Sequence, residues 1–217
     1  MVNWNAIDSI IFDMDGTLWD ATESYSTVWN ICSDKLGIDK KISRDELLGY
    51  MGKPIDVIFN EIFAGDKTVN TDEYISLLDV TEDKMMPILG GIPYDTMAQN
   101  IAKLAKHYKL FLISNCGKNG LNIFMKYTGI THYITDTLTF GATLKPKSDN
   151  IKHLIAKHNL SATTYMGDTQ GDCDETHRAN IPFIYASYGF GKCSNPEITF
   201  DSFNEFASYF LKLKSEV

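Results

Sequence analysis

Short apolar segments alternate along the chain with longer segments in which apolar residues recur every three or four positions. The apolar segments cover residues 9–12, 110–113, 163–166 and 182–185, with a weaker candidate at 133–138. Each is short and nearly continuous in its hydrophobicity, which is typical of parallel strands that are covered on both faces. The pattern therefore predicts a sheet of at least four parallel strands.

Helices are predicted between these strands from stripes of apolar side chains at helical spacing. One stripe contains Met97, Ile101, Leu104 and Tyr108, and another contains Ile151, Leu154 and Ile155. In the C-terminal helix, Ser202 is expected to be the N-cap, with Glu205 three residues later in a capping box. Strands that alternate with helices indicate an α/β, doubly wound parallel sheet, in which ligands bind beyond the carboxyl ends of the strands.

The segment from residue 21 to residue 86 departs from this alternation, because it contains four helical patterns and no convincing strand. Such a block is too long for an ordinary connection between two strands. We expect residues 21–86 to be a separate helical insert after the first strand, whereas residues 1–20 and 87–217 form the core.

Composition and charge narrow the class of protein. The 217 residues carry a formal net charge of −8, which argues against a general nucleic-acid binder, since such proteins need a basic face. No apolar run approaches the length of a membrane span, and the first residues lack the pattern of a signal peptide. Four scattered cysteines indicate free thiols. We expect a cytoplasmic protein, a monomer or small homo-oligomer, that binds neither membrane nor nucleic acid.

Polar residues gather at the predicted strand ends. Asp13 and Asp15 follow the first strand, Ser114 and Asn115 end the second, and Asp168 ends the third, with Asp172 four residues later. Any one of these residues could simply be a helix cap or a loop residue. As a set, however, the aspartates would repel one another at one edge of the sheet unless a cation lay among them.

Carboxylate ligands without a nearby histidine or cysteine favour Mg²⁺. The segment "LKPKSDN" before the helix that contains Ile151 and Leu154 also offers Lys145 and Lys147. A metal ion and a lysine around a carboxylate form a phosphate site, in which the carboxylate acts as the nucleophile.

The four segments "DMDGT", "LISN", "KPKSD" and "GDTQGD" resemble, in this order, the four motifs of the haloacid dehalogenase superfamily. The similarity extends over essentially the whole chain and is greatest to the phosphoglycolate phosphatase-like and β-phosphoglucomutase-like branch, which has a Rossmann-like core and a helical cap. Near residue 180 the chain departs from the family, because Asn180 stands where a glycine usually ends the helix; asparagine also tolerates the left-handed conformation.

The resemblance implies an Mg²⁺-dependent phosphatase that hydrolyses a small phosphorylated metabolite, of the phosphoglycolate or sugar phosphate type, through an aspartyl-phosphate intermediate. It implies the following roles. Asp13 is the nucleophile, Asp15 is the general acid and base, and Asp13, Asp168 and the main-chain carbonyl of Asp15 bind Mg²⁺. Ser114 and the Asn115 main-chain N–H bind the phosphoryl group, Lys145 (directly before Pro146) pairs with the phosphate and Asp13, and Asp172 orients the metal.

The cap is expected to exclude water and to recognise the leaving group. Its loop "GYMGKP", residues 49–54, contains Lys53, a candidate for binding an anionic or hydroxyl-rich tail, although an ordinary solvated lysine is an equal explanation. Three other functions were weighed. A sugar phosphomutase would use the same intermediate, a dehalogenase would lack the second aspartate, and a non-catalytic binding protein would not need the intact motif set.

Overall fold

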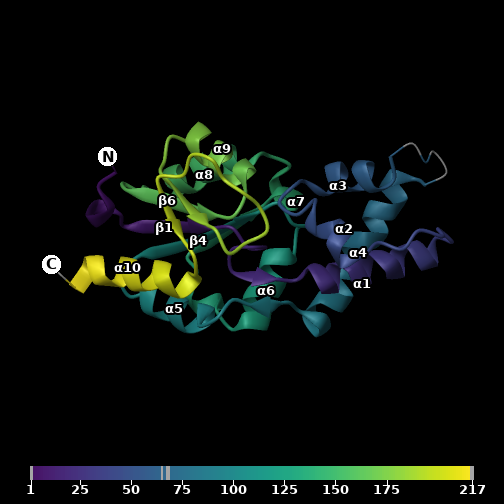
Figure 1. Cartoon of the computed structure of the whole chain (residues 1–217), viewed down its shortest axis with the longest axis horizontal. Coiled ribbons are helices and arrows are strands. Elements are labelled where there is room, and N and C mark those ends of the chain that lie inside the picture. The colour runs from purple at the N-terminus through teal and green to yellow at the C-terminus, as the bar shows by residue number, and fades with distance from the viewer. Residues whose placement is uncertain (1, 65, 67–68, 216–217) are drawn as a thin grey trace.

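The computed structural model describes residues 2–64, 66 and 69–215. Its core is a six-stranded parallel sheet in the order β5-β4-β1-β6-β7-β8, with β1 near the middle (Figure 1). The strands are β1 (Ser9–Phe12), β4 (Lys109–Ser114), β5 (Asp136–Thr139), β6 (Thr163–Gly167), β7 (Phe183–Ala186) and β8 (Ile198–Phe200). The predicted α/β fold is confirmed, and the weak candidate at 133–138 is a strand over its last three residues only. The sequence analysis missed β8, which has only three residues.

Alternate residues of the central strands pack into two separate hydrophobic cores. Ile10 and Phe12 belong to one core, whereas Ile11 and Tyr165 belong to the other. Helices α5 (Met97–Leu104), α6 (Gly120–Thr128) and α10 (Phe203–Ser215) contribute to the first core, and α8 (Lys147–His158) and α9 (Gln170–Arg178) contribute to the second. Because both faces of the sheet are covered, its central strands β1 and β4 are apolar over most of their length, as the sequence pattern indicates.

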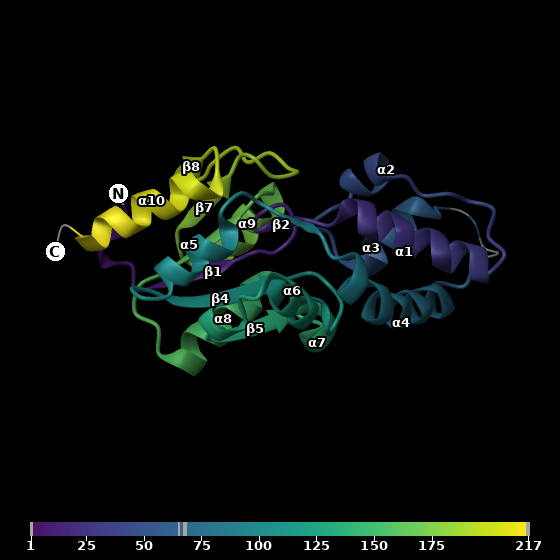
Figure 2. The same ribbon diagram turned by 90° about the horizontal axis from the view of Figure 1, so that it is seen from below.

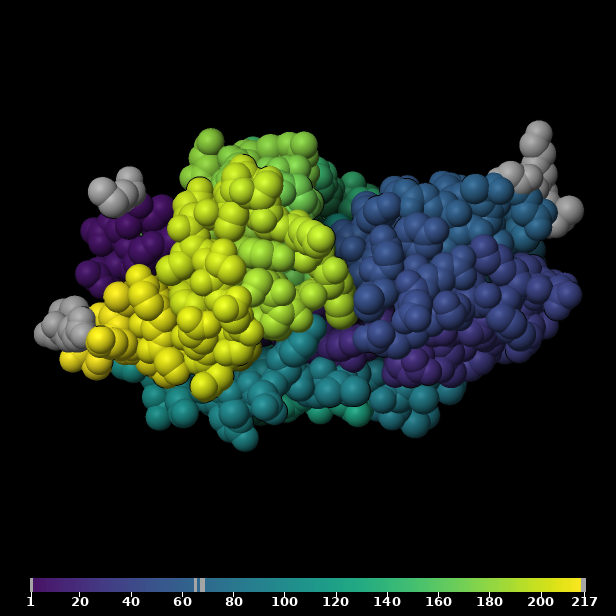
Figure 3. All heavy atoms as spheres, in the orientation of Figure 1, coloured from purple at the N-terminus to yellow at the C-terminus, as the bar shows by residue number. Residues whose placement is uncertain are grey.

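The four helices predicted between residues 21 and 86 are present at one end of the molecule (Figure 2). They are α1 (Thr22–Lys35), α2 (Arg44–Leu48), α3 (Ile55–Ile62) and α4 (Thr71–Leu89). Tyr74 of α4 is completely buried among aromatic rings, with centroids 5.1–5.5 Å away, contributed by Trp29, Phe59 and Phe63. This aromatic cluster holds the helical block together, and in Figure 3 the block (purple to blue) meets the core (green to yellow) directly.

The two connections between the helical block and the core run side by side. They form an antiparallel ribbon of β2 (Trp19–Asp20) and β3 (Ile92–Pro93), neither of which the sequence analysis predicted. Helix α4 continues three residues beyond the expected boundary and ends before Gly90, which has a positive φ of 61°. A Cβ at Gly90 would overlap the ring of Tyr127, so glycine is needed there for both space and backbone conformation.

Smaller elements complete the described chain: the helical turn α7 (Phe140–Thr143) and two 3₁₀ helices, Trp4–Ala6 and Thr131–Tyr133. Asn180 has the left-handed conformation, with φ 58°. Ser202 caps α10 by accepting the N–H of Glu205 at 3.1 Å, but the Glu205 carboxylate accepts from Asp201 rather than from Ser202. Among the described residues, no helix has the length and apolar character needed to cross a membrane.

Candidate active site

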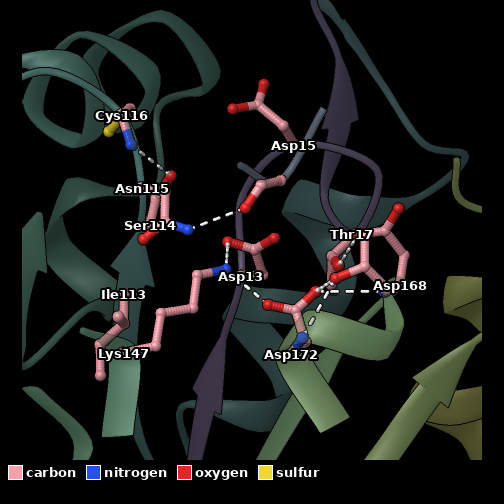
Figure 4. Close-up of polar contacts among 12 residues, drawn as sticks. Asp13, Asp15, Thr17, Ile113, Ser114, Asn115, Cys116, Lys147, Asp168 and Asp172 are labelled. Atoms are coloured by element: carbon pink, nitrogen blue, oxygen red, sulfur yellow. Dashed lines mark hydrogen bonds and ion pairs between the residues drawn. The ribbon is translucent and has the colours of Figure 1, made fainter. Parts of the chain in front are cut away.

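The polar residues predicted at the strand ends lie at one edge of the sheet (Figure 4). Asp13 and Asp15 follow β1, Ser114 and Asn115 lie at the end of β4, and Asp168 follows β6. Since β4, β1 and β6 are neighbouring parallel strands, their carboxyl ends meet at the same edge. The structure therefore brings these five residues together.

The lysine beside Asp13 is Lys147, and this corrects the expectation for Lys145. The Lys147 Nζ atom lies 2.8 Å from Asp13 Oδ1 and 2.5 Å from Asp172 Oδ1, and all three side chains are buried. Lys145 is exposed. The reason is local: Pro146 is the extended N-cap of α8, so Lys147 is the first helical residue and is directed into the site.

A sequence signal for Lys147 was available in the helical spacing. Ile151 and Leu154 lie four and seven residues after Lys147, and both are fully buried on the inner side of α8. Residues at such spacings share one face of a helix. Lys147 therefore belongs to the face that packs on the sheet, whereas Lys145 precedes the helix.

Asp172 connects the lysine to the start of α9. Its Oδ1 atom accepts from Lys147, and its Oδ2 atom accepts the N–H of Thr169 at 3.1 Å and the hydroxyl of Thr169 at 2.6 Å. Thr169 in turn caps α9 in a capping box. A Cβ at Gly167 would lie 2.7 Å from the Cβ of Asp172, so the absence of a side chain there lets α9 start close to β6.

Asp168 faces the same site from the other side of Asp13. Its Oδ2 atom accepts the N–H of Phe190 at 2.7 Å, and its Oδ1 atom lies 3.5 Å from the hydroxyl of Thr17. Oxygen atoms of Asp13, Asp168 and Asp172 all lie within 4.8 Å of one another. Such a group of buried carboxylates could hold a metal ion.

The electrostatics of these carboxylates fit a divalent cation. The pKa of Asp13 is raised to about 6, because burial, together with the charge of Asp172, outweighs the lowering effect of Lys147. Burial and the two neighbouring aspartates raise the pKa of Asp168 well above its usual value. One lysine thus offsets only part of the repulsion, and the oxygen ligands suit a hard cation such as Mg²⁺.

Asp15 occupies a different environment from Asp13. Its carboxylate is directed away from Asp13 (Figure 4), and it accepts from Trp19 Nε1 at 2.9 Å and from the Tyr25 hydroxyl at 3.5 Å. Burial, followed by the charge of Asp13, raises the pKa of Asp15 to about 7. A carboxyl group with this pKa can both give and accept a proton near neutral pH. The contacts of Trp19 and Tyr25 with Asp15 were not predicted from the sequence.

Ser114 and Asn115 form the wall at the end of β4. Ser114 is buried, and its hydroxyl accepts the N–H of Cys116 at 3.2 Å. The side chain of Asn115 reaches across to the helical block and donates to the carbonyl of Gly52 at 2.8 Å. The loop that contains Gly52 and Lys53 therefore lies over the site, as the sequence suggests for "GYMGKP".

A pocket extends from Asp13 and Asp15 into the helical block. Its lining is largely apolar and aromatic, with four acidic residues and two lysines: Asp13, Asp15, Tyr25, Trp29, Leu47, Met51, Gly52, Lys53, Ile55, Ile58, Leu78, Asp79, Glu82, Ser114, Asn115, Cys116, Gly117 and Lys147. Lys53 lines this pocket, but its Nζ atom is 2.7 Å from Glu61 Oε2. Asp79 and Glu82 were not recognised from the sequence, because they lie on an ordinary amphipathic helix.

Comparisons with known proteins agree with this geometry. The profile of a family described as haloacid dehalogenase-like hydrolase matches residues 10–186. Among curated proteins, the pyrophosphatase PpaX of Bacillus velezensis is 27% identical over 176 residues, covering 76% of each chain. The phosphoglycolate phosphatase of Photobacterium profundum is 21% identical and covers 94% of this chain and 96% of its own.

Solved structures share the whole fold. A haloacid dehalogenase-like family protein from Streptococcus pneumoniae superimposes with a TM-score of 0.82 at 19% identity, covering 94% of this chain and 98% of that protein. CbbY from Rhodobacter sphaeroides, solved in complex with xylulose-1,5-bisphosphate, has a TM-score of 0.79 at 15% identity and covers 92% and 96%. At these identities the likeness establishes the fold.

Proposed function

Because the chain belongs to the haloacid dehalogenase-like hydrolase family and is a phosphatase, we propose that it hydrolyses a small phosphorylated metabolite through an aspartyl-phosphate intermediate on Asp13. The observation that carries the proposal is the buried contact of 2.8 Å between Asp13 and Lys147 at the end of β1. A buried lysine keeps the nucleophile ionised and can also bind a phosphoryl oxygen.

In the proposed first step, one oxygen of Asp13 attacks phosphorus and the bond to the leaving alcohol oxygen breaks. The carboxyl group of Asp15 gives its proton to that oxygen. In the second step, Asp15 takes a proton from water, the water oxygen attacks phosphorus, and the Asp13 carboxylate leaves as inorganic phosphate is released. The raised pKa of Asp15, about 7, supports both proton transfers near neutral pH.

Other residues bind and orient the phosphoryl group. We assign Ser114, the Asn115 main-chain N–H and Lys147 to the phosphoryl oxygens. Asp13, Asp168 and the main-chain carbonyl of Asp15 would hold Mg²⁺, with Asp172 orienting the site through its contact with Lys147. When bound, Mg²⁺ supplies positive charge that neutralises the transferring phosphoryl group. The four cysteines are free thiols, which is compatible with the cytoplasmic location that we propose.

The test is release of inorganic phosphate from a panel of phosphomonoesters in the presence of Mg²⁺, comparing the wild type with Asp13→Asn. The amide has the same shape but is a poor nucleophile, so we expect turnover to fall by at least about a thousandfold with the fold intact. Analysis of the organic product distinguishes a phosphatase from a phosphomutase. If Asp13→Asn keeps more than a few per cent of the wild-type rate, the aspartyl-phosphate mechanism is wrong.

A further inference from the structure

The leaving group of any substrate attacked by Asp13 must occupy the pocket between the core and the helical block, so the lining of this pocket determines which alcohol is accepted. Two lysines line it. Lys147 is bound to Asp13 and Asp172, and Lys53 is bound to Glu61. Neither ammonium group is therefore available as an uncompensated positive charge for a distant part of the substrate.

Two acidic side chains in the same pocket, the partly buried Glu82 and the exposed Asp79, have no such basic partner among the described residues. Asp79 and Glu82 lie one helical turn apart on α4 and face the loop after β4. A Cβ at Gly117 would be 3.1 Å from Asp79 Oδ1 and 3.7 Å from Glu82 Oε2. In the part of the chain that the structure describes, neither carboxylate takes part in an ion pair or a hydrogen bond.

Asp83, the residue after Glu82, serves as a comparison, because its carboxylate has a structural role. Its Oδ2 atom accepts from Asn119 Nδ2 at 2.8 Å, and this bond links α4 to the start of α6. By contrast, the pKa of Glu82 is raised to about 8, chiefly by burial and then by the charges of Asp79, Asp15 and Asp83. The carboxylate of Glu82 thus lies where a positive charge would be stabilised.

The rest of the pocket is suited to an organic cation. Besides the two acidic residues, the wall of the pocket contains the rings of Tyr25 and Trp29 together with aliphatic side chains such as Leu78. Aromatic faces attract ammonium groups, and carboxylates bind them through charge-assisted hydrogen bonds. An anionic tail such as a carboxylate would instead meet two acidic side chains, which offer it no positive partner.

We infer, on the basis of the proposed phosphatase function, that the preferred substrate is a phosphomonoester whose leaving alcohol carries a cationic amine bound by Glu82 and Asp79. This differs from the expectation that Lys53 binds an anionic or hydroxyl-rich tail. The difference arises because Glu61 neutralises Lys53, whereas Asp79 and Glu82 form no ion pair with any of the described residues.

The experiment compares matched substrates that differ in charge alone. ω-Aminoalkyl phosphates with chains of two to five carbons are compared with alkyl phosphates of equal length, and kcat/KM is measured for each in the presence of Mg²⁺. At the best length we expect the amine to exceed its alkyl counterpart by about ten- to a hundredfold, the range for a charge-assisted hydrogen bond. Phosphoglycolate and glycerol phosphate serve as anionic and hydroxylated comparisons, and both are expected to be poorer than the best amine.

Variants locate the source of the preference. Glu82→Gln keeps the shape of the side chain, and we expect it to lower the ratio of amine to alkyl kcat/KM by about tenfold; Asp79→Asn is a second, independent variant with the same expected direction. Asp72→Asn is the matched control, because Asp72 lies on the same helix and is exposed, but does not line the pocket. Its ratio is expected to equal that of the wild type.

The outcomes separate this inference from the proposed function. If the wild type releases phosphate but the ratio is close to one at every chain length, the phosphatase assignment stands and this inference is overturned. A preference for glycerol phosphate or phosphoglycolate over every amine overturns it equally, as does a ratio that neither pocket variant changes. If no compound releases phosphate, p-nitrophenyl phosphate included, the proposed function itself fails, and the inference fails with it.

Discussion

Acidic residues form two clusters near the active site, one in the core and one in the helical block. The two clusters differ in how their negative charge is compensated. In the core, Asp13 and Asp172 share Lys147 at 2.8 and 2.5 Å, and Asp168 accepts the N–H of Phe190. In the helical block, Asp79 and Glu82 have neither a basic partner nor a hydrogen-bond donor among the described residues.

The comparison shows which carboxylates lack a compensating positive charge among the described residues. Carboxylates that are packed together raise one another's pKa unless a cation is close. In the core, the lysine and the backbone provide part of the compensation, and a metal ion can provide the remainder. In the helical block, Asp79 is exposed and Glu82 is partly buried, and neither forms an ion pair with a described residue, so a cationic group on the substrate would be their closest positive partner, which is the physical basis of the inferred amine specificity.

The largest effect is expected from removal of the metal. After dialysis against EDTA we expect phosphate release to be lost completely, and addition of Mg²⁺ should restore it. Ca²⁺ should not restore it, because its larger and less regular coordination shell disturbs the alignment of Asp13. Mg²⁺ should also raise the melting temperature of the wild type, since a ligand that binds only the folded state stabilises it.

Asp168→Asn is the control for the metal experiment, because it removes one of the clustered carboxylates. Its melting temperature should respond to Mg²⁺ much less than that of the wild type. Full activity of the EDTA-treated wild type would contradict the metal requirement.

The next largest effect distinguishes the two lysines before α8. Lys147→Ala should lower kcat by about a hundred- to a thousandfold, as loss of a group that stabilises the transition state does. It should also destabilise the protein by about 3–5 kcal/mol without Mg²⁺, because it leaves buried carboxylates unpaired. Lys145→Ala, on the exposed loop, should have the activity and melting temperature of the wild type. Equal losses in the two variants would refute the assignment of Lys147.

A smaller effect concerns pH and stability in the absence of metal. The pKa values of Asp13, Asp15 and Glu82 are raised to about 6, 7 and 8, whereas unfolded Asp and Glu titrate near about 4. Between these values the folded state holds protons that the unfolded state has lost. Stability from these groups is therefore complete below about pH 4 and is lost as the pH rises through the folded pKa values.

This dependence can be checked by thermal melts from pH 5 to pH 8.5 in EDTA. We expect the wild-type melting temperature to fall across this range, and Glu82→Gln to reduce the fall by about 2–4 °C, which corresponds to roughly 1 kcal/mol in a protein of this size. Asp72→Asn should follow the wild type. If the curve of Glu82→Gln has the same slope as that of the wild type, Glu82 does not have the raised pKa described above.

The smallest effect is expected at Lys53, whose pairing with Glu61 is largely exposed. Exposed ion pairs contribute at most about 1 kcal/mol, so Lys53→Ala should change kcat/KM for phosphoglycolate by less than about fivefold. Glu61→Gln would free the ammonium group, and a rise of a few-fold with phosphoglycolate is expected. A much larger loss in Lys53→Ala would restore the role in specificity that its position in the loop suggests.

The order of strands and helices and the acidic residues at the strand ends could be predicted from the sequence, because both depend on local patterns. Buried parallel strands need continuous apolar residues, and a polar residue directly after such a strand lies at the edge of the sheet. The sequence in this way determined the α/β core, the four helices between residues 21 and 86, and the grouping of Asp13, Asp15, Ser114, Asn115 and Asp168.

Only the tertiary structure decided which side chains meet across separate elements. The choice between Lys145 and Lys147 depends on where α8 begins relative to Pro146 and on which of its faces packs against the sheet. The exposed pairing of Lys53 with Glu61, and the position of Asp79 and Glu82 over Gly117, depend on how the helical block rests on the core. Such contacts join residues far apart in the chain, so their charges act on one another only after the two parts have packed together.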